Sequence, residues 1–142
     1  QLDHDGLLNL VWSELVEPQL GQQLPVVIFD WPASQAALAR TRSANGKLVA
    51  ERFELYYRGV ELANGYHELV DAGVLLERAR ANNDSRQEDG KERLPEQSRL
   101  LAAMRTGAAL GAGVAAGIDR WVMLKLGCQS IRDVLAFPIE RA

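Results

Sequence analysis

Apolar side chains near the amino terminus recur three or four positions apart, as they do along one face of a helix. This spacing runs through residues 3–15, behind aspartates that can cap a first turn. Residues 24–32 form a short run rich in apolar and β-branched side chains, which Pro32 closes. The patterns predict a helix over 3–15 and a buried strand over 24–32.

Alternation of apolar and polar side chains predicts a strand over 51–57. Arg58-Gly59 suits a tight two-residue turn, because glycine tolerates the positive φ that such turns need. Residues 60–69 would then return antiparallel. The polar stretch 39–47 before this hairpin is expected to be a loop.

The second half of the chain predicts further helices between loops. The stretch 82–95 has almost no apolar residues, which favours a mobile loop. The other expected elements are helices over 71–82, 95–104 and 120–126, a small-residue strand over 113–117 and a last strand over 134–138. Strands and helices mixed around a hairpin predict an α+β fold, with a mostly antiparallel sheet flanked by helices.

Composition narrows the class of protein. With 142 residues, 47% hydrophobic and 25% charged, the chain suits one globular domain and is neither disordered nor collagen-like. A net charge of -3 argues against a broad nucleic-acid-binding face but is compatible with a local basic patch. The single Cys128 cannot form an internal disulfide. There is no secretory signal pattern and no apolar run of roughly 18 residues that could span a membrane.

Two glutamates on the hairpin are candidate metal ligands. If Tyr57 and Val60 flank the turn, Glu54 faces Ala63 and lies diagonally from Glu61, about 7–8 Å away. Such a pair can hold Mg²⁺ against substrate phosphates. The alternative is that both side chains face solvent, which is the usual state of glutamate.

Asn64, Tyr66 and Glu68 fall on the apolar face of a regular strand, where a carboxylate is costly unless it is paired. A β-bulge at Asn64-Gly65 would move Glu68 to the face of Glu61. Glu68 would then suit either a ligand ammonium or an internal arginine.

The glycine-rich run GAGVAAGIDR lacks the GK[ST] of a P-loop. Its small residues would let a flat ligand approach the backbone, and Arg120 at the following helix start could bind a phosphate or stack on a base. The alternative is tight packing, with Arg120 paired to Asp119 or another acid.

Three segments in order, FELYYRGVELANGYHEL, GVAAGIDRWVML and SIRDVLAFPIERA, resemble the C-terminal part of a class II lysyl-tRNA synthetase catalytic core. The resemblance runs from about Pro25 to Ala142, and residues 111–126 are similar to motif 3 of that class. Within the superfamily, WPASQAALA, Tyr66-His67-Glu68 and Ala115 resemble the paralogue that attaches (R)-β-lysine to elongation factor P.

The resemblance implies a role for each matching residue. Glu54 and Glu61 would hold Mg²⁺ against ATP. Leu62, Gly117 and Arg120 would line the nucleotide site with Glu61, Arg120 as the catalytic arginine. The amino-acid pocket would comprise Asn64, Tyr66, Glu68 and Ala115, whose methyl group narrows it.

The resemblance also implies a reaction: lysine or (R)-β-lysine is activated by ATP as an acyl-adenylate and passed to a lysine of elongation factor P. The implied enzyme is cytoplasmic and homodimeric, and a lysine-tRNA ligase is the alternative. Motifs 1 and 2 are not recognisable in residues 1–142, so we expect this partial catalytic domain to be inactive in adenylation by itself. An alternative of another class is a non-catalytic, oligomerising module with exposed strand edges.

Overall fold

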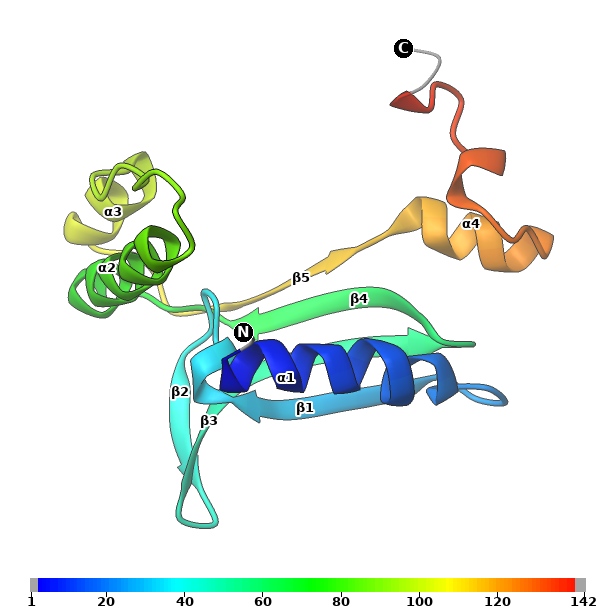
Figure 1. The fold of residues 1–142 in the computed structure, drawn as a ribbon, viewed down its shortest axis with the longest axis horizontal. Coiled ribbons are helices and arrows are strands. Elements are labelled where there is room, and N and C mark those ends of the chain that lie inside the picture. The colour runs from blue at the N-terminus through cyan, green and yellow to red at the C-terminus, as the bar shows by residue number, and fades with distance from the viewer. Residues whose placement is uncertain (1–2, 140–142) are drawn as a thin grey trace.

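The computed structural model describes residues 3–139, which form a five-stranded antiparallel sheet with helices across one face and at its ends (Figure 1). The main path of the sheet is β1 (Val26–Pro32), β3 (Lys47–Tyr57), β4 (Val60–His67) and β5 (Ala112–Ala116). The short strand β2 (Thr41–Ala44) pairs with the beginning of β3. The predicted α+β class and its antiparallel sheet are confirmed.

The amino-terminal helix lies in front of β1 and β3 in Figure 1. Helix α1 (His4–Val11) begins at Asp3, whose side chain caps it, and it continues as a π-helix over Trp12–Val16. Trp12 packs edge-on against Trp31 of β1, with ring centroids 4.7 Å apart. This contact joins the helix to the small core, which contains Trp31, Ala36, Ala39 and Ala50. The predicted first helix and first strand are confirmed, but the prediction that this strand is buried is wrong, because Val27 and Phe29 are 50% and 68% exposed.

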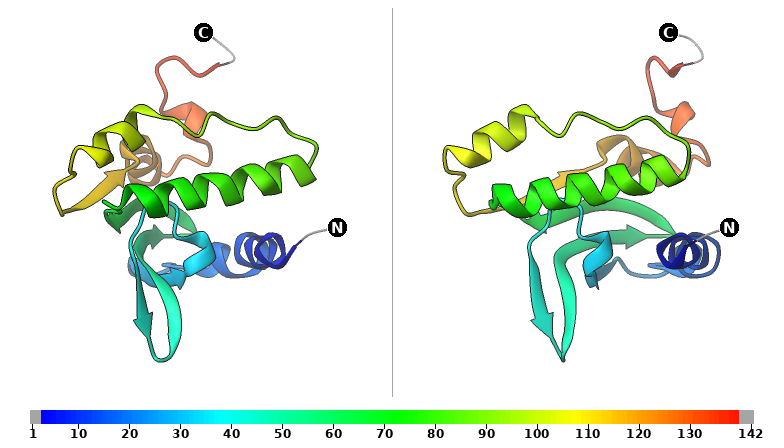
Figure 2. Two further views of the ribbon diagram at one scale, coloured as in Figure 1. Left: turned by 90° about the vertical axis from the view of Figure 1, so that its left-hand side faces the viewer. Right: turned by 60° about the vertical axis from the view of Figure 1, so that its left-hand side comes forward.

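Two tight turns shape the sheet. Arg58 and Gly59 have φ values of 51° and 72°, as a type I′ hairpin turn requires, and the predicted hairpin is confirmed. Asn45 and Gly46 make a second such turn. The loop expected over 39–47 is therefore wrong in part: these residues include β2 and the start of β3, which project from the sheet as a ribbon (Figure 2). The polar strand β2 lacks the apolar alternation that would have identified it.

The register between β3 and β4 changes at Leu62. Tyr56 pairs with Glu61, but Leu55 pairs with Ala63, so Leu62 is an extra residue in β4. The bulge therefore lies at Leu62 and the prediction of a bulge at Asn64-Gly65 is wrong. Leu62 is only 2% exposed, so burial of its side chain stabilises the bulge.

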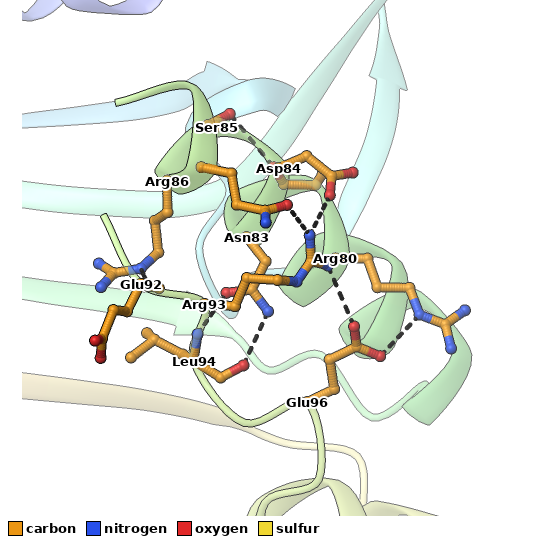
Figure 3. A network of polar contacts seen from close by, with 11 residues as sticks. Arg80, Asn83, Asp84, Ser85, Arg86, Glu92, Arg93, Leu94 and Glu96 are labelled. Atoms are coloured by element: carbon orange, nitrogen blue, oxygen red, sulfur yellow. Dashed lines mark hydrogen bonds and ion pairs between the residues drawn. The ribbon is translucent and has the colours of Figure 1, made fainter. Parts of the chain in front are cut away.

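Helix α2 (Ala72–Glu88), capped by Asp71, continues through part of the predicted mobile loop. The irregular residues after α2 are tied back to it (Figure 3). Buried Asn83 donates to the Leu94 carbonyl (2.9 Å) and accepts from its N–H (2.8 Å), and Arg93 donates to Asp84 (2.8 Å). The loop predicted over 82–95 is wrong for residues 82–88, which continue helix α2, whereas residues 89–95 are irregular as predicted.

The remaining elements lead to the carboxyl-terminal side of the molecule. Helix α3 (Arg99–Arg105) is capped by Ser98, later than predicted, and α4 (Ile118–Leu126) ends at Gly127 as predicted. Residues 134–138 are irregular, so the strand predicted there is wrong. Within residues 3–139, no helix has the length and apolar character needed to cross a bilayer.

Candidate active site

Polar side chains from β3 and β4, beside small residues of β5, share the sheet face on which α1 lies. Residues paired across neighbouring strands point to the same side, so the register identifies the members of this face. Arg52 pairs with Tyr66, which pairs with Gly113, and Glu54 pairs with Asn64, which pairs with Ala115. We call this surface the site face; it comprises Arg52, Glu54, Tyr56, Glu61, Asn64, Tyr66, Gly113 and Ala115.

Glu54 is the buried charge of the site face, with 4% exposure. Its Oε1 accepts hydrogen bonds from Arg52 and from Asn64 Nδ2 (3.1 Å), and its Oε2 accepts from the Tyr56 hydroxyl (2.5 Å). A buried carboxylate is tolerated only with such partners. For Glu54, the alternative of a solvent-facing side chain is therefore wrong, and so is its expected pairing with Ala63.

Tyr56 connects Glu54 to the amino-terminal helix. The Trp12 indole N–H donates to the Tyr56 hydroxyl (3.3 Å), which in turn donates to Glu54. Burial, followed by the hydrogen bond to Glu54, raises the pKa of Tyr56 above its usual value. Tyr56 and Arg52 were not predicted as site residues, although strand alternation places both on the side of Glu54.

The Glu68 carboxylate lies over Gly113 of β5. A Cβ atom on Gly113 would stand 2.6 Å from Glu68 Oε1, so glycine leaves the room that this carboxylate occupies. Within residues 3–139, Glu68 forms no ion pair with a side chain, and the alternative of an internal arginine partner is wrong. The carboxylate is therefore open to an ammonium group from outside.

Several buried polar atoms near the site face lack a hydrogen-bond partner among the described residues: Trp31 Nε1, Arg52 Nε and Asn64 Oδ1. Unsatisfied buried groups of this kind are rare in proteins and call for a water or ligand. Ala115 is the register partner of Asn64, so its methyl group lies on the same face as that open amide oxygen.

The predicted nucleotide residues meet where β4 adjoins α4. Gly117 N–H donates to the Leu62 carbonyl (2.9 Å). Arg120 donates to the Glu61 carbonyl (2.7 Å) and to Glu61 Oε2 (3.2 Å), so its acidic partner is Glu61. The Arg120 and Glu61 side chains remain 44% and 30% exposed, which leaves both accessible to a ligand.

Glu17 adds a third carboxylate that the sequence did not indicate. It lines a cavity of about 480 Å³ together with Glu54 and Glu61, and a second cavity of about 300 Å³ with Glu61 and Arg120. Burial, then the charges of Glu61 and Glu54, raise the pKa of Glu17. Because Glu17 follows an irregular helix end, no periodic pattern could assign it to this site.

The donors present define how a metal ion could fit. Within residues 3–139, no group of three or more histidine, cysteine, aspartate or glutamate side chains is arranged to hold one. Both oxygens of Glu54 already accept from protein donors, whereas Glu61 is partly exposed. The residues fit a Mg²⁺ ion that arrives with phosphates and takes the Glu61 carboxylate. Coordination of Mg²⁺ by Glu54 as well stays a prediction. It would require Glu54 to give up one of its hydrogen bonds to the protein.

Known proteins are similar to this chain in sequence. The family model of class II tRNA synthetases (D, K and N) matches residues 15–141. The chain is 45% identical over 142 residues to a Pasteurella multocida protein and 48% identical over 140 residues to a Vibrio cholerae protein, both named elongation factor P--(R)-beta-lysine ligase. The matches cover 100% and 99% of the chain but only 44% and 43% of those relatives. Because the family model matches most of the length of this chain, the chain belongs to the class II tRNA synthetases of the D, K and N group.

Proposed function

We propose that this chain supplies amino-acid and nucleotide sites to an ATP-dependent ligase. The ligase would activate (R)-β-lysine or lysine as an acyl-adenylate and pass it to a lysine of elongation factor P. The observation that carries the proposal is the combination, along β4 and β5, of the unpaired Glu68 carboxylate with the accessible Arg120–Glu61 pair. The names of the relatives support the same activity.

The amino-acid pocket would lie on the site face, over the paired strands β4 and β5. Glu68 would pair with a substrate ammonium, and the open Asn64 Oδ1 would accept a hydrogen bond from an amino group. Tyr66 would wall the pocket. The Ala115 methyl group would narrow it beside Asn64, which favours a substrate whose amino group is displaced by one carbon.

The nucleotide would lie along Glu61, Leu62 and Gly117, with Arg120 turning from Glu61 to the ATP phosphates. Mg²⁺, when bound at Glu61, would offset phosphate charge. The substrate carboxylate attacks the α-phosphorus, the bond to the bridging oxygen breaks, and pyrophosphate leaves. The acceptor amine then attacks the acyl carbon, AMP leaves, an amide forms and the amine proton passes to solvent. The residues of this chain would contribute by positioning ATP and the amino acid and by offsetting the charge on the phosphates.

Two further features belong to the proposal. The full-length protein would be a cytoplasmic homodimer, as the family resemblance implies. A protein acceptor in place of tRNA also belongs to the proposal, and it is supported by the names of the relatives.

The test is ATP–pyrophosphate exchange by the full-length protein with (R)-β-lysine and with α-lysine. We expect a higher kcat/KM for (R)-β-lysine, and Ala115→Gly should shift the preference toward α-lysine. Ala116→Gly is the matched control, since Ala116 pairs with Ala63 on the opposite face. Exchange with neither amino acid would overturn the ligase assignment, and preference of the unmodified protein for α-lysine would overturn the substrate. Transfer of label to tRNA and not to elongation factor P would favour the lysine-tRNA ligase.

A further inference from the structure

His67 lies where β3 and β4 separate. Beyond the Arg52–Tyr66 pair, Arg40 enters between the two strands: Glu51 N–H donates to the Arg40 carbonyl (2.8 Å), and Arg40 N–H donates to the His67 carbonyl (2.8 Å). Ala39 and Glu68 form the next antiparallel bridge. The backbone that carries Glu68 is therefore held on this side by residues 39–40 and no longer by β3.

The His67 ring joins the same three segments through its two nitrogens. Nδ1 lies 2.8 Å from Glu51 Oε2, and Nε2 lies 3.2 Å from Arg40 Nη1. A guanidinium has only donors, so Nε2 must accept the Arg40 hydrogen bond. This arrangement places the ring proton on Nδ1, which donates it to Glu51.

Strand alternation puts His67 on the reverse side of β4 from Tyr66 and Glu68, so the ring does not face the substrate pocket. We propose that His67, as the Nδ1–H tautomer bridging Glu51 and Arg40, is a positioning residue that fixes Glu68 over Gly113. The proposal rests on the proposed function, in which Glu68 receives the substrate ammonium. The proposal adds the residue that orients this carboxylate.

The bridge requires a donor at one end of the side chain and an acceptor at the other. Phenylalanine keeps the shape of the ring but provides neither group. Glutamine provides both, because its amide nitrogen can donate to Glu51 and its oxygen can accept from Arg40. His67→Phe and His67→Gln therefore separate the hydrogen bonds from the packing.

The kinetic test compares these variants in the full-length protein by ATP–pyrophosphate exchange. We expect His67→Phe to raise the KM for the amino acid about tenfold or more, as misplacement of a binding group does. The KM for ATP should stay within about twofold, since Arg120 and Gly117 lie at the opposite end of β4. In His67→Gln, the KM for the amino acid should return close to the wild-type value. A purely structural role would lower the active fraction, and so kcat, and leave the amino-acid KM unchanged, which would overturn the proposal.

A second readout does not depend on the reaction. In the full-length protein labelled with ¹⁵N-histidine, His67 should show a protonated Nδ1 and an unprotonated Nε2, assigned by loss of the signals in His67→Gln. Hydrogen exchange of the Glu68 amide, which donates to the Gly111 carbonyl (2.9 Å), should be faster in His67→Phe. An Nε2–H or doubly protonated ring, or an unchanged Glu68 amide, would overturn the bridge. If the protein showed the expected His67 signals and Glu68 amide exchange but no ATP–pyrophosphate exchange activity, the proposed function alone would be overturned.

Discussion

At the scale of single residues, Glu54 depends on donors from its own strand and the next one. Arg52 and Tyr56 approach from β3, and Asn64 approaches from β4. Because Trp12 donates to Tyr56, the orientation of this carboxylate also depends on the amino-terminal helix. The site face is thus coupled to the segment before the sheet.

Replacing Tyr56 by phenylalanine removes one donor to buried Glu54 and the acceptor for Trp12. We expect the free energy of unfolding to fall by about 1–2 kcal/mol, the usual effect of leaving a buried acceptor short of one partner. Urea denaturation measures this. Tyr57→Phe is the control, since the Tyr57 ring stacks against Arg58 on the opposite face. Equal losses in both variants would contradict the hydrogen-bonded chain from Trp12 to Glu54.

Glu17 predicts how stability depends on pH. Its pKa is higher in the folded protein than the ordinary value of 4.5, so the folded state binds this proton more tightly than the unfolded state does. The contribution of Glu17 to stability is therefore greatest below pH 4.5 and decreases as pH rises through the raised pKa. Glu17→Gln removes the ionisation, so its stability relative to wild type should increase from pH 4 to pH 7.

Denaturation across a pH series would test this, with Glu14→Gln, at an exposed position of the preceding helix, as the control. If wild type and Glu17→Gln change in parallel with pH, Glu17 does not share an electrostatic site with Glu54 and Glu61.

At the scale of elements, β5 presents its only glycine, Gly113, to the Glu68 carboxylate. Gly113→Ala would place a methyl group 2.6 Å from Glu68 Oε1, so the carboxylate has to move. In the full-length protein we expect kcat/KM for the amino acid to fall by roughly ten- to a hundredfold. Gly111→Ala is the control, because nothing lies within 4 Å of a Cβ at that position. Equal kinetics for the two variants in ATP–pyrophosphate exchange would contradict a Glu68 carboxylate that lies against Gly113.

The hairpin and its chemistry were predictable because strand alternation and the Arg58-Gly59 turn are local signals. The conflict at Asn64, Tyr66 and Glu68 even predicted a bulge, although not its position. That position depends on burial of Leu62 against the rest of the fold, which no local pattern encodes.

The errors elsewhere have the same origin. Residues 82–88 are helical although they carry no apolar stripe, because Asn83 and Arg93 tie the following segment to α2. Glu17 could not be assigned to the site, because long-range folding alone brings it to Glu54 and Glu61.

At the scale of the molecule, the side of the sheet opposite the site face is apolar and open. Within residues 3–139, Val27, Phe29 and Val114 of the sheet are 50%, 68% and 64% exposed. The outer strands β1 and β5 each pair with one neighbour along the described sheet. Open apolar surface next to unpaired strand edges favours association.

We therefore expect the chain, purified at its present length, to self-associate as its concentration rises. Phe29→Lys should reduce this association, because it places a charge on the open face. Phe137→Lys is the control, since Phe137 is 83% exposed but lies in an irregular segment outside the sheet. Static light scattering is the measurement. A monomer at all concentrations, or equal effects of the two substitutions, would contradict self-association through the apolar side of the sheet.

The path from β4 to β5 has a further consequence for how such a protein can diverge. Helices α2 and α3 form an excursion that leaves the sheet after Glu68 and returns at Gly111, whose carbonyl accepts from the Glu68 amide (Figure 1). Its two ends thus meet, so insertions or deletions within it need not disturb the strands that carry the pocket. Arg78 ties the first half of α2 to the residues that precede β2, because it donates to the Ala37 and Ala39 carbonyls. Length variation among homologues should accumulate beyond that arginine, and a grafted module could be accommodated there.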